Sequence, residues 1–126
     1  MNNDIEPFVP RDRLLLVSIA ETIGKTKSVY DAARFAWPVN VDRARNVDLV
    51  LACMKGIVKG VFVPRHWMEA TKKNFPDLVA THRDLRWGFE GVEADQSIRA
   101  NYLEKRVPDN ITIGQIGFRY FDDLAA

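Results

Sequence analysis

The sequence predicts an α+β domain with a small, bent, mostly antiparallel sheet, or a partial barrel, and two to three helices. Apolar segments of strand length alternate with segments of helical spacing, in the order strand, helix, hairpin, loop, strand, helix, strand. A Lys55-Gly56 turn separates two apolar runs, as in a hairpin. Glycines inside the predicted strands would permit the bending that a curved sheet needs: Gly60, Gly88, Gly91 and Gly117.

The first half of the chain gives an apolar strand and two short helices. Leu14–Ile19 is an apolar run suited to a buried strand. Ser28, with Asp31 three residues later, predicts a helix N-terminus, and small or apolar residues then repeat at helical spacing until Pro38. Asn40 is expected to cap a second short helix or turn in the segment VDRAR.

The second half contains the hairpin and the remaining elements. Residues 47–54 are apolar on both faces and predict a central strand, which returns over residues 57–64. Gly60 in the return strand indicates a bulge, a barrel corner or a close approach to the backbone. The other predicted elements are a short helix over 67–73 followed by a long loop, a strand over 86–92, a helix over 97–104 and a last strand over 113–121.

Length and composition indicate one domain, residues 1–126, whose first twelve residues are expected to be flexible. A chain of 126 residues can bury roughly two thirds of its unfolded surface without a metal or disulfide. No apolar run approaches the roughly 20 residues of a membrane-spanning helix, and the N-terminus lacks the features of a signal peptide. A cytoplasmic protein without a membrane partner is therefore expected, with Cys53 as a reduced core thiol.

The charge is unevenly distributed along the chain. Residues 25–87 contain twelve lysines and arginines against six acidic residues, whereas both flanks are acidic. If the fold gathers these basic side chains, they would form a face that attracts phosphate; otherwise they are scattered over a solvated surface.

Most motifs for catalysis or metal binding are absent from the sequence. The Gly24-Lys25-Thr26 triplet lacks the upstream glycine of a phosphate-binding loop, and His66 and His82 are too far apart to form a closely spaced ligand pair. The GFRYF segment at 117–121 resembles half of an RNA-binding strand, but its partner motif is missing, which favours an ordinary amphipathic strand. Glu90 and Glu93, near Asp95, leave open a carboxylate cluster that holds magnesium.

Each of the three tryptophans lies near an arginine in the sequence. Tyr30, Arg34 and Trp37 would share one helix face, and the other pairs are Arg65 with Trp67 and Arg86 with Trp87. A base can stack on an aromatic ring while a guanidinium group binds phosphate. The alternative is that the tryptophans are core residues on which arginines pack. The candidate nucleic-acid-binding residues are Arg34, Trp37, Arg43, Arg65, Trp67 and Arg86.

A series of short motifs carries a resemblance to a known family. The motifs are WPVxxxRA at 37–44, GIVxGVF at 56–62, RWxFxG at 86–91 and YLxKRVP at 102–108. Together they resemble an uncharacterised family of small prokaryotic and phage domains, found alone or beside restriction-type modules, which has no established activity. The GIVxGVF strand is also weakly similar to PUA-like barrels such as the EVE and ASCH groups. Some of these bind RNA or modified bases in an aromatic-lined pocket, so the resemblance implies nucleic-acid binding.

Three functions are compatible with these observations. The first is a non-enzymatic domain that binds nucleic acid or a nucleotide through the six candidate residues and needs no cofactor. The second is a protein-interaction module or homodimer, in which exposed aromatic and arginine side chains anchor the interface. The third is a small metal-dependent hydrolase that uses Glu90 and neighbouring acids.

Overall fold

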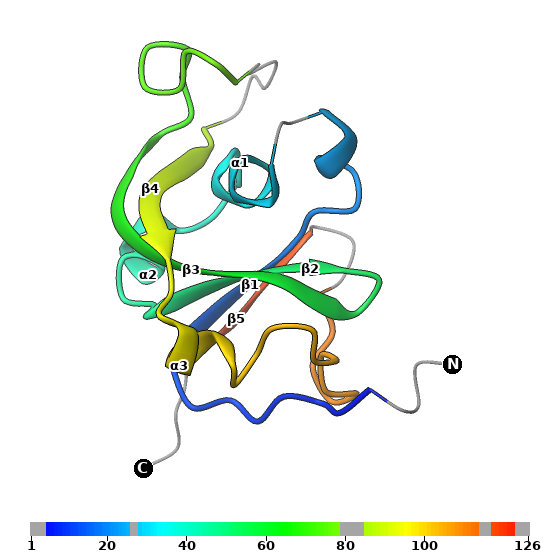
Figure 1. Cartoon of the computed structure of the whole chain (residues 1–126). Helices are drawn as coiled ribbons and strands as arrows, with labels where there is room; N and C mark the ends of the chain where they lie inside the picture. Colours follow the sequence, from blue (N-terminus) through cyan, green and yellow to red (C-terminus); the bar gives the residue numbers. More distant parts are fainter. Residues whose placement is uncertain (1–4, 26–27, 79–84, 114–116, 123–126) are drawn as a thin grey trace.

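The computed structural model describes residues 5–25, 28–78, 85–113 and 117–122, which form an open five-stranded sheet with short helices on both faces (Figure 1). The strand order is β4-β3-β2-β1-β5. Only β1 and β2 run parallel, and every other neighbouring pair is antiparallel. The strands are β1 (Leu14–Ser18), β2 (Leu49–Met54), β3 (Ile57–Glu69), β4 (Trp87–Glu93) and β5 (Phe118–Phe121). The predicted α+β class and mostly antiparallel sheet are confirmed, and the sheet is not closed.

The predicted hairpin forms the centre of the sheet. β2 is buried on both faces except at its last residue, and β3 returns beside it. Lys55 and Gly56 have φ angles of 53° and 78°, which suit a two-residue turn whose twist matches the strands. The register shifts opposite Gly60, where an added methyl group would lie 2.8 Å from a Val29 methyl carbon. Both a bulge and a close approach therefore explain this glycine.

β3 is longer than the sequence analysis predicted, and the helix expected over 67–73 is wrong. Trp67 lies in β3 opposite Phe89 of β4, with their ring centroids 5.1 Å apart. The register shifts between Pro64 and His66, so the strand continues past the proline through an irregularity. Burying Trp67 against Phe89 stabilises the strand more than the weak helical pattern could stabilise a helix.

Both predicted helices of the first half are present, although the first is shorter than expected. α1 (Val29–Arg34) begins at Ser28, whose Oγ accepts a hydrogen bond from the Asp31 amide at 3.0 Å. It ends before Phe35, which is extended and packs on Phe75 at a centroid distance of 5.0 Å. Trp37 therefore does not share a helix face with Arg34. α2 (Val41–Ala44) is capped by Asn40, as predicted.

The last two predicted elements are also shorter than expected. α3 (Gln96–Arg99) is a single turn that continues as hydrogen-bonded turns to residue 105. The last strand covers 118–121, and residues 114–116 of the predicted strand lie outside the described residues. A short 3-10 turn, η2 (Ile23–Lys25), precedes α1.

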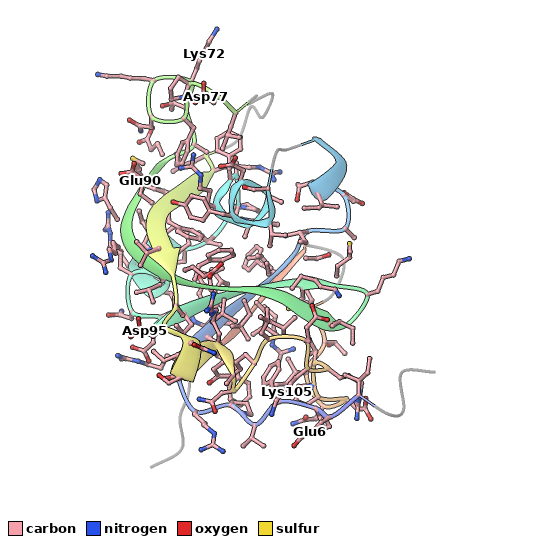
Figure 2. The ribbon with its side chains drawn as sticks, in the orientation of Figure 1. Glu6, Lys72, Asp77, Glu90, Asp95 and Lys105 are labelled. Carbon is pink, nitrogen blue, oxygen red and sulfur yellow. The ribbon has the colours of Figure 1, made fainter. Side chains whose placement is uncertain are left out.

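Two hydrophobic clusters lie on opposite faces of the sheet. α1 covers one face, and β3 and β4 curve up beside it (Figure 1). α3, the turns after it and the N-terminal segment cover the other. Phe8 is buried against Tyr102, whose hydroxyl donates to Asp12 at 2.6 Å, and Lys105 pairs with Glu6 at the same surface (Figure 2).

Residues 5–12, within the segment expected to be flexible, are therefore docked on the sheet through both apolar and polar contacts.

None of the helices in the described part of the chain is long and apolar enough to span a bilayer.

Candidate functional site

The two tryptophans predicted to stack on a base are buried. Trp37 and Trp67 are each 6% exposed. The Trp37 indole donates to the Ala33 carbonyl at 2.7 Å, and its backbone exchanges two hydrogen bonds with Trp87. A methyl group added at Gly117 would lie 3.4 Å from the Trp37 ring, so this side chain also reaches the start of β5. Both residues are parts of the core, which was the alternative interpretation.

Arg34 is held inside the fold. Its Nε donates to Asp31 at 2.9 Å, and the side chain is only 18% exposed. The guanidinium group lies 4.9 Å from the Tyr30 ring centroid and 5.2 Å from that of Phe75. Aromatic rings and a carboxylate thus occupy the surfaces with which this arginine could bind a ligand.

The remaining candidate arginines do not converge on one face. Arg65 is exposed at the irregularity of β3, and Arg86 is half-buried just before β4. Arg43 belongs to α2 and contacts β5 instead, at the opposite end of the strand order. The single basic, tryptophan-containing face that the sequence suggested is therefore not assembled by these six residues.

The acidic residues near β4 are also separated. Glu90 is exposed opposite His66, whereas Asp95 lies beyond the end of β4 beside α3 (Figure 2). Glu93 pairs with Arg99. Within the described ranges, no group of three or more histidine, cysteine, aspartate or glutamate side chains could hold a metal ion.

A hollow of about 380 Å³ lies between α2 and the edge strand β5. We call it the β5 hollow; it is lined by Asn40, Arg43, Phe118, Arg119 and Tyr120. Strand alternation places the two aromatic side chains on the α1 face of the sheet, where both are half-buried. Arg119 points to the other face, where its guanidinium donates to the Thr112 carbonyl at 3.2 Å.

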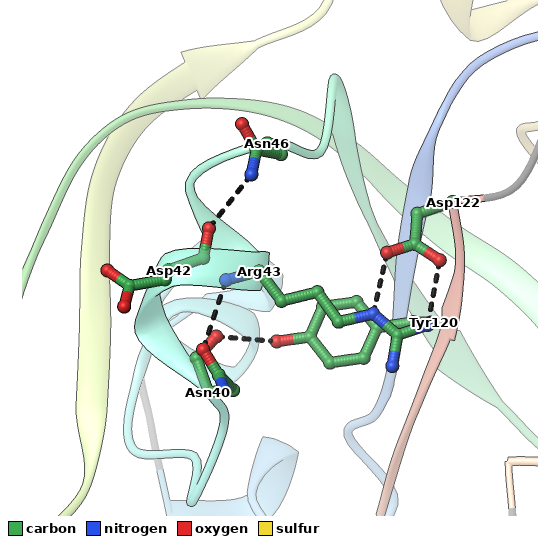
Figure 3. A network of polar contacts seen from close by, with 6 residues as sticks. All are labelled: Asn40, Asp42, Arg43, Asn46, Tyr120 and Asp122. Carbon is green, nitrogen blue, oxygen red and sulfur yellow. Dashed lines mark hydrogen bonds and ion pairs between the residues drawn. The ribbon is translucent and has the colours of Figure 1, made fainter.

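Arg43 is fixed at the β5 hollow by a carboxylate and an aromatic ring (Figure 3). Its Nε and Nη2 donate to the two Asp122 oxygens at 2.6 and 2.8 Å. The guanidinium carbon lies 4.2 Å from the Tyr120 ring centroid, while 53% of the side chain remains exposed. The hydrogen bonds from Arg43 hold the pKa of Asp122 below its usual range, so the carboxylate stays ionised at neutral pH.

Tyr120 anchors this arrangement from the strand. Its hydroxyl donates to the Asn40 carbonyl at 3.0 Å, and the Asn40 side chain in turn accepts from the Arg43 amide at 3.1 Å (Figure 3). Burial raises the pKa of Tyr120 to about 12, so its hydroxyl keeps its proton at neutral pH. The same residues that cap α2 therefore set the position of the tyrosine ring under the guanidinium group.

The chemistry available at the β5 hollow is planar stacking combined with hydrogen-bond donation. Tyr120 covers one side of the Arg43 guanidinium, and the other side of this planar group can stack on a flat ligand. Two N–H groups bind Asp122, and among the described residues no acceptor is present for the others, which can donate to a phosphate. This combination suits a nucleotide.

A second hollow of about 480 Å³ lies near the turn between β2 and β3. Its lining includes Lys55, Cys53 and apolar residues of the segment 107–113. Burial raises the pKa of the Cys53 thiol to about 12, so Cys53 is not a reactive nucleophile. Only one cation lines this hollow in the described part of the chain, and no aromatic ring accompanies it, so the β5 hollow is the better candidate.

Comparison with protein-family models, curated proteins and solved structures finds no match to this chain. The family resemblance consequently rests on the sequence motifs alone.

Arg43 was predicted as a candidate from the sequence, but its partners Tyr120 and Asp122 were not. Tyr120 and Phe118 belong to the GFRYF segment, whose resemblance to an RNA-binding strand was the available signal. Asp122 is 79 residues from Arg43, and no local pattern connects the two. Strand pairing brings them together, because β5 returns to the sheet beside β1.

Proposed function

We propose that this protein binds nucleic acid without catalysing a reaction, and that the β5 hollow is the site that holds a nucleotide. The observation that carries the proposal is Arg43, which is stacked on Tyr120 while half of its side chain stays exposed. Bases stack on tyrosine rings and on arginine planes in RNA-binding proteins, and phosphates accept hydrogen bonds from the same guanidinium group. A cytoplasmic setting, where a buried thiol such as Cys53 stays reduced, is part of this proposal.

The basic residues outside the hollow support a general attraction to phosphate. Arg65 is exposed on β3, and Lys72 and Lys73 are exposed in the following turns. Such side chains contribute to affinity by releasing counterions, which makes binding weaker at higher salt. They carry no specificity of their own, so the nucleotide-sized hollow is the place where a particular base would be held.

The test measures the fluorescence anisotropy of short labelled DNA and RNA oligonucleotides during titration with the protein, at low and moderate salt. Arg43→Ala is compared with Arg45→Ala, since Arg45 is similarly exposed, directly follows α2 and also pairs with an acid, Asp42. We expect Arg43→Ala to weaken binding about tenfold and Arg45→Ala less than about twofold.

Each outcome of this comparison is informative. Equal losses in the two variants would show that only net charge matters and would reject the β5 hollow as the site. No binding at low salt would reject the function itself. A mass that rises with protein concentration, unaffected by oligonucleotides, would favour the homodimer instead.

A further inference from the structure

The outer edge of β5 carries backbone hydrogen-bonding groups that do not pair with β1. The Ser18 amide donates to the Gly117 carbonyl at 2.7 Å. Because hydrogen-bonded and non-hydrogen-bonded pairs alternate in an antiparallel ladder, this bond determines which residues of β5 bond to β1 through their backbone. Arg119 is then the next residue to pair with β1 through its backbone. The N–H and C=O groups of Phe118 and Tyr120 therefore point away from β1.

This edge is open in the described part of the chain. β5 is the last strand in the sheet order, and no described segment pairs with its outer side. β4, at the other edge, is partly covered, because Trp87 pairs with Trp37 and the Gly91 amide donates to the Tyr30 hydroxyl. The open edge and the β5 hollow share Phe118, Arg119 and Tyr120.

The size of the β5 hollow limits what it can hold. Its volume of about 380 Å³ is near the lower end of the range for small-molecule pockets, so a single nucleotide is enough to fill it. An extended strand edge presents alternating donors and acceptors, as does the Watson–Crick edge of a base. In a duplex that edge is already paired with the other strand.

Resting on the proposed function, we infer that the ligand is single-stranded nucleic acid, from which one unpaired base enters the β5 hollow. The base stacks on the side of the Arg43 guanidinium that Tyr120 does not cover, and its Watson–Crick edge bonds to the outward backbone groups of Phe118 and Tyr120. The flanking phosphates remain outside, near the exposed N–H groups of Arg43. This arrangement excludes duplex ligands, because the Watson–Crick edges of their bases are already paired.

The first experiment compares a thymidine oligomer with the same oligomer methylated at N3 of every base, and with a blunt duplex that contains the same strand. Methylation removes the imide donor but leaves the phosphates unchanged. We expect the single strand to bind at least about tenfold tighter than either the methylated strand or the duplex. Equal binding of the single strand and the duplex would overturn the inference while leaving the proposed function intact. Absence of binding by all three would reject the proposed function itself.

The second experiment tests the backbone edge with a matched pair of variants. Phe118→Ala removes the ring and keeps the outward N–H, whereas Phe118→Pro removes both and spares the bonds to β1. We expect Phe118→Pro to bind the thymidine oligomer about fivefold more weakly than Phe118→Ala, at equal melting temperature. Equal affinities of the two variants would overturn the inference. A dimer of the protein that dissociates in Phe118→Pro but not in Phe118→Ala would also overturn it, because a second copy of the chain would then occupy the edge of β5.

Discussion

Arg34 and Arg43 have similar partners but differ in exposure. Each pairs with an aspartate and lies over an aromatic ring, at 4.9 Å for Tyr30 and 4.2 Å for Tyr120. The Arg34 side chain is 18% exposed and lies between two rings, whereas that of Arg43 is 53% exposed and has one. The comparison shows that an arginine beside an aromatic ring is enclosed by the fold where a second ring also contacts it, and stays accessible where none does.

We expect the greatest change from a substitution of the core residue Trp67. Trp67→Ala removes a ring that is 6% exposed and packs on Phe89, so it should lower the free energy of unfolding by about 3–5 kcal/mol. Chemical denaturation measures this change. Binding of the thymidine oligomer by the fraction that remains folded should be unchanged, and a specific loss of affinity would contradict the assignment of Trp67 to the core.

The second substitution tests the affinity of the β5 hollow for a single strand. Tyr120→Ala removes the ring under Arg43 and should weaken binding of a single strand by about 1–3 kcal/mol, roughly 5- to 150-fold. Isothermal titration calorimetry checks this value, and circular dichroism checks that the variant is folded. Tyr120→Phe is the control: it keeps the ring and loses only the bond to Asn40, so most of the affinity should remain.

Arg34→Ala tests the arginine that is enclosed by the fold. The variant loses the ion pair with Asp31 and the contacts with two rings. We therefore expect its free energy of unfolding to fall by about 1–2 kcal/mol. Its affinity for oligonucleotides should fall by less than about twofold, the loss of one distant charge. A tenfold loss would place Arg34 in the binding site and remove the distinction between the two arginines.

The smallest effect concerns the carboxylate that holds Arg43. Asp122→Asn removes a negative charge beside the expected phosphate position, so affinity should rise about two- to fivefold. The pKa of Asp122 is lowered in the fold, so its pairing stabilises the native state above the ordinary carboxyl pKa of about 4, and this stabilisation is lost as pH falls from there through the lowered pKa. Melting temperatures should consequently fall less steeply with acid in the variant. An unchanged affinity would show that Asp122 does not compete with the ligand.

The sequence predicted local structure well and the site poorly, for a physical reason. The caps at Ser28 and Asn40 and the turn at Lys55-Gly56 depend on neighbouring residues, and all three are present. The end of α1 and the length of β3 depend on distant partners, Phe75 and β4, which no local pattern reveals. Arg43 was identified as a candidate from the sequence. The position of its guanidinium group, however, depends on Tyr120 and Asp122, which strand pairing brings beside it.

The pairing of β1 with β5 makes the order of synthesis matter. Leu14 lies opposite Phe121, a residue that is made much later in the chain. While the polypeptide emerges from the ribosome, one edge of the apolar strand β1 has no partner until residues 118–121 have been made, and the β5 hollow cannot form before then. A chain that stops short of residue 118 would therefore leave the backbone groups at this edge of β1 unpaired and would lack the β5 hollow. Synthesis of β5 would thus complete the sheet and form the β5 hollow in a single step.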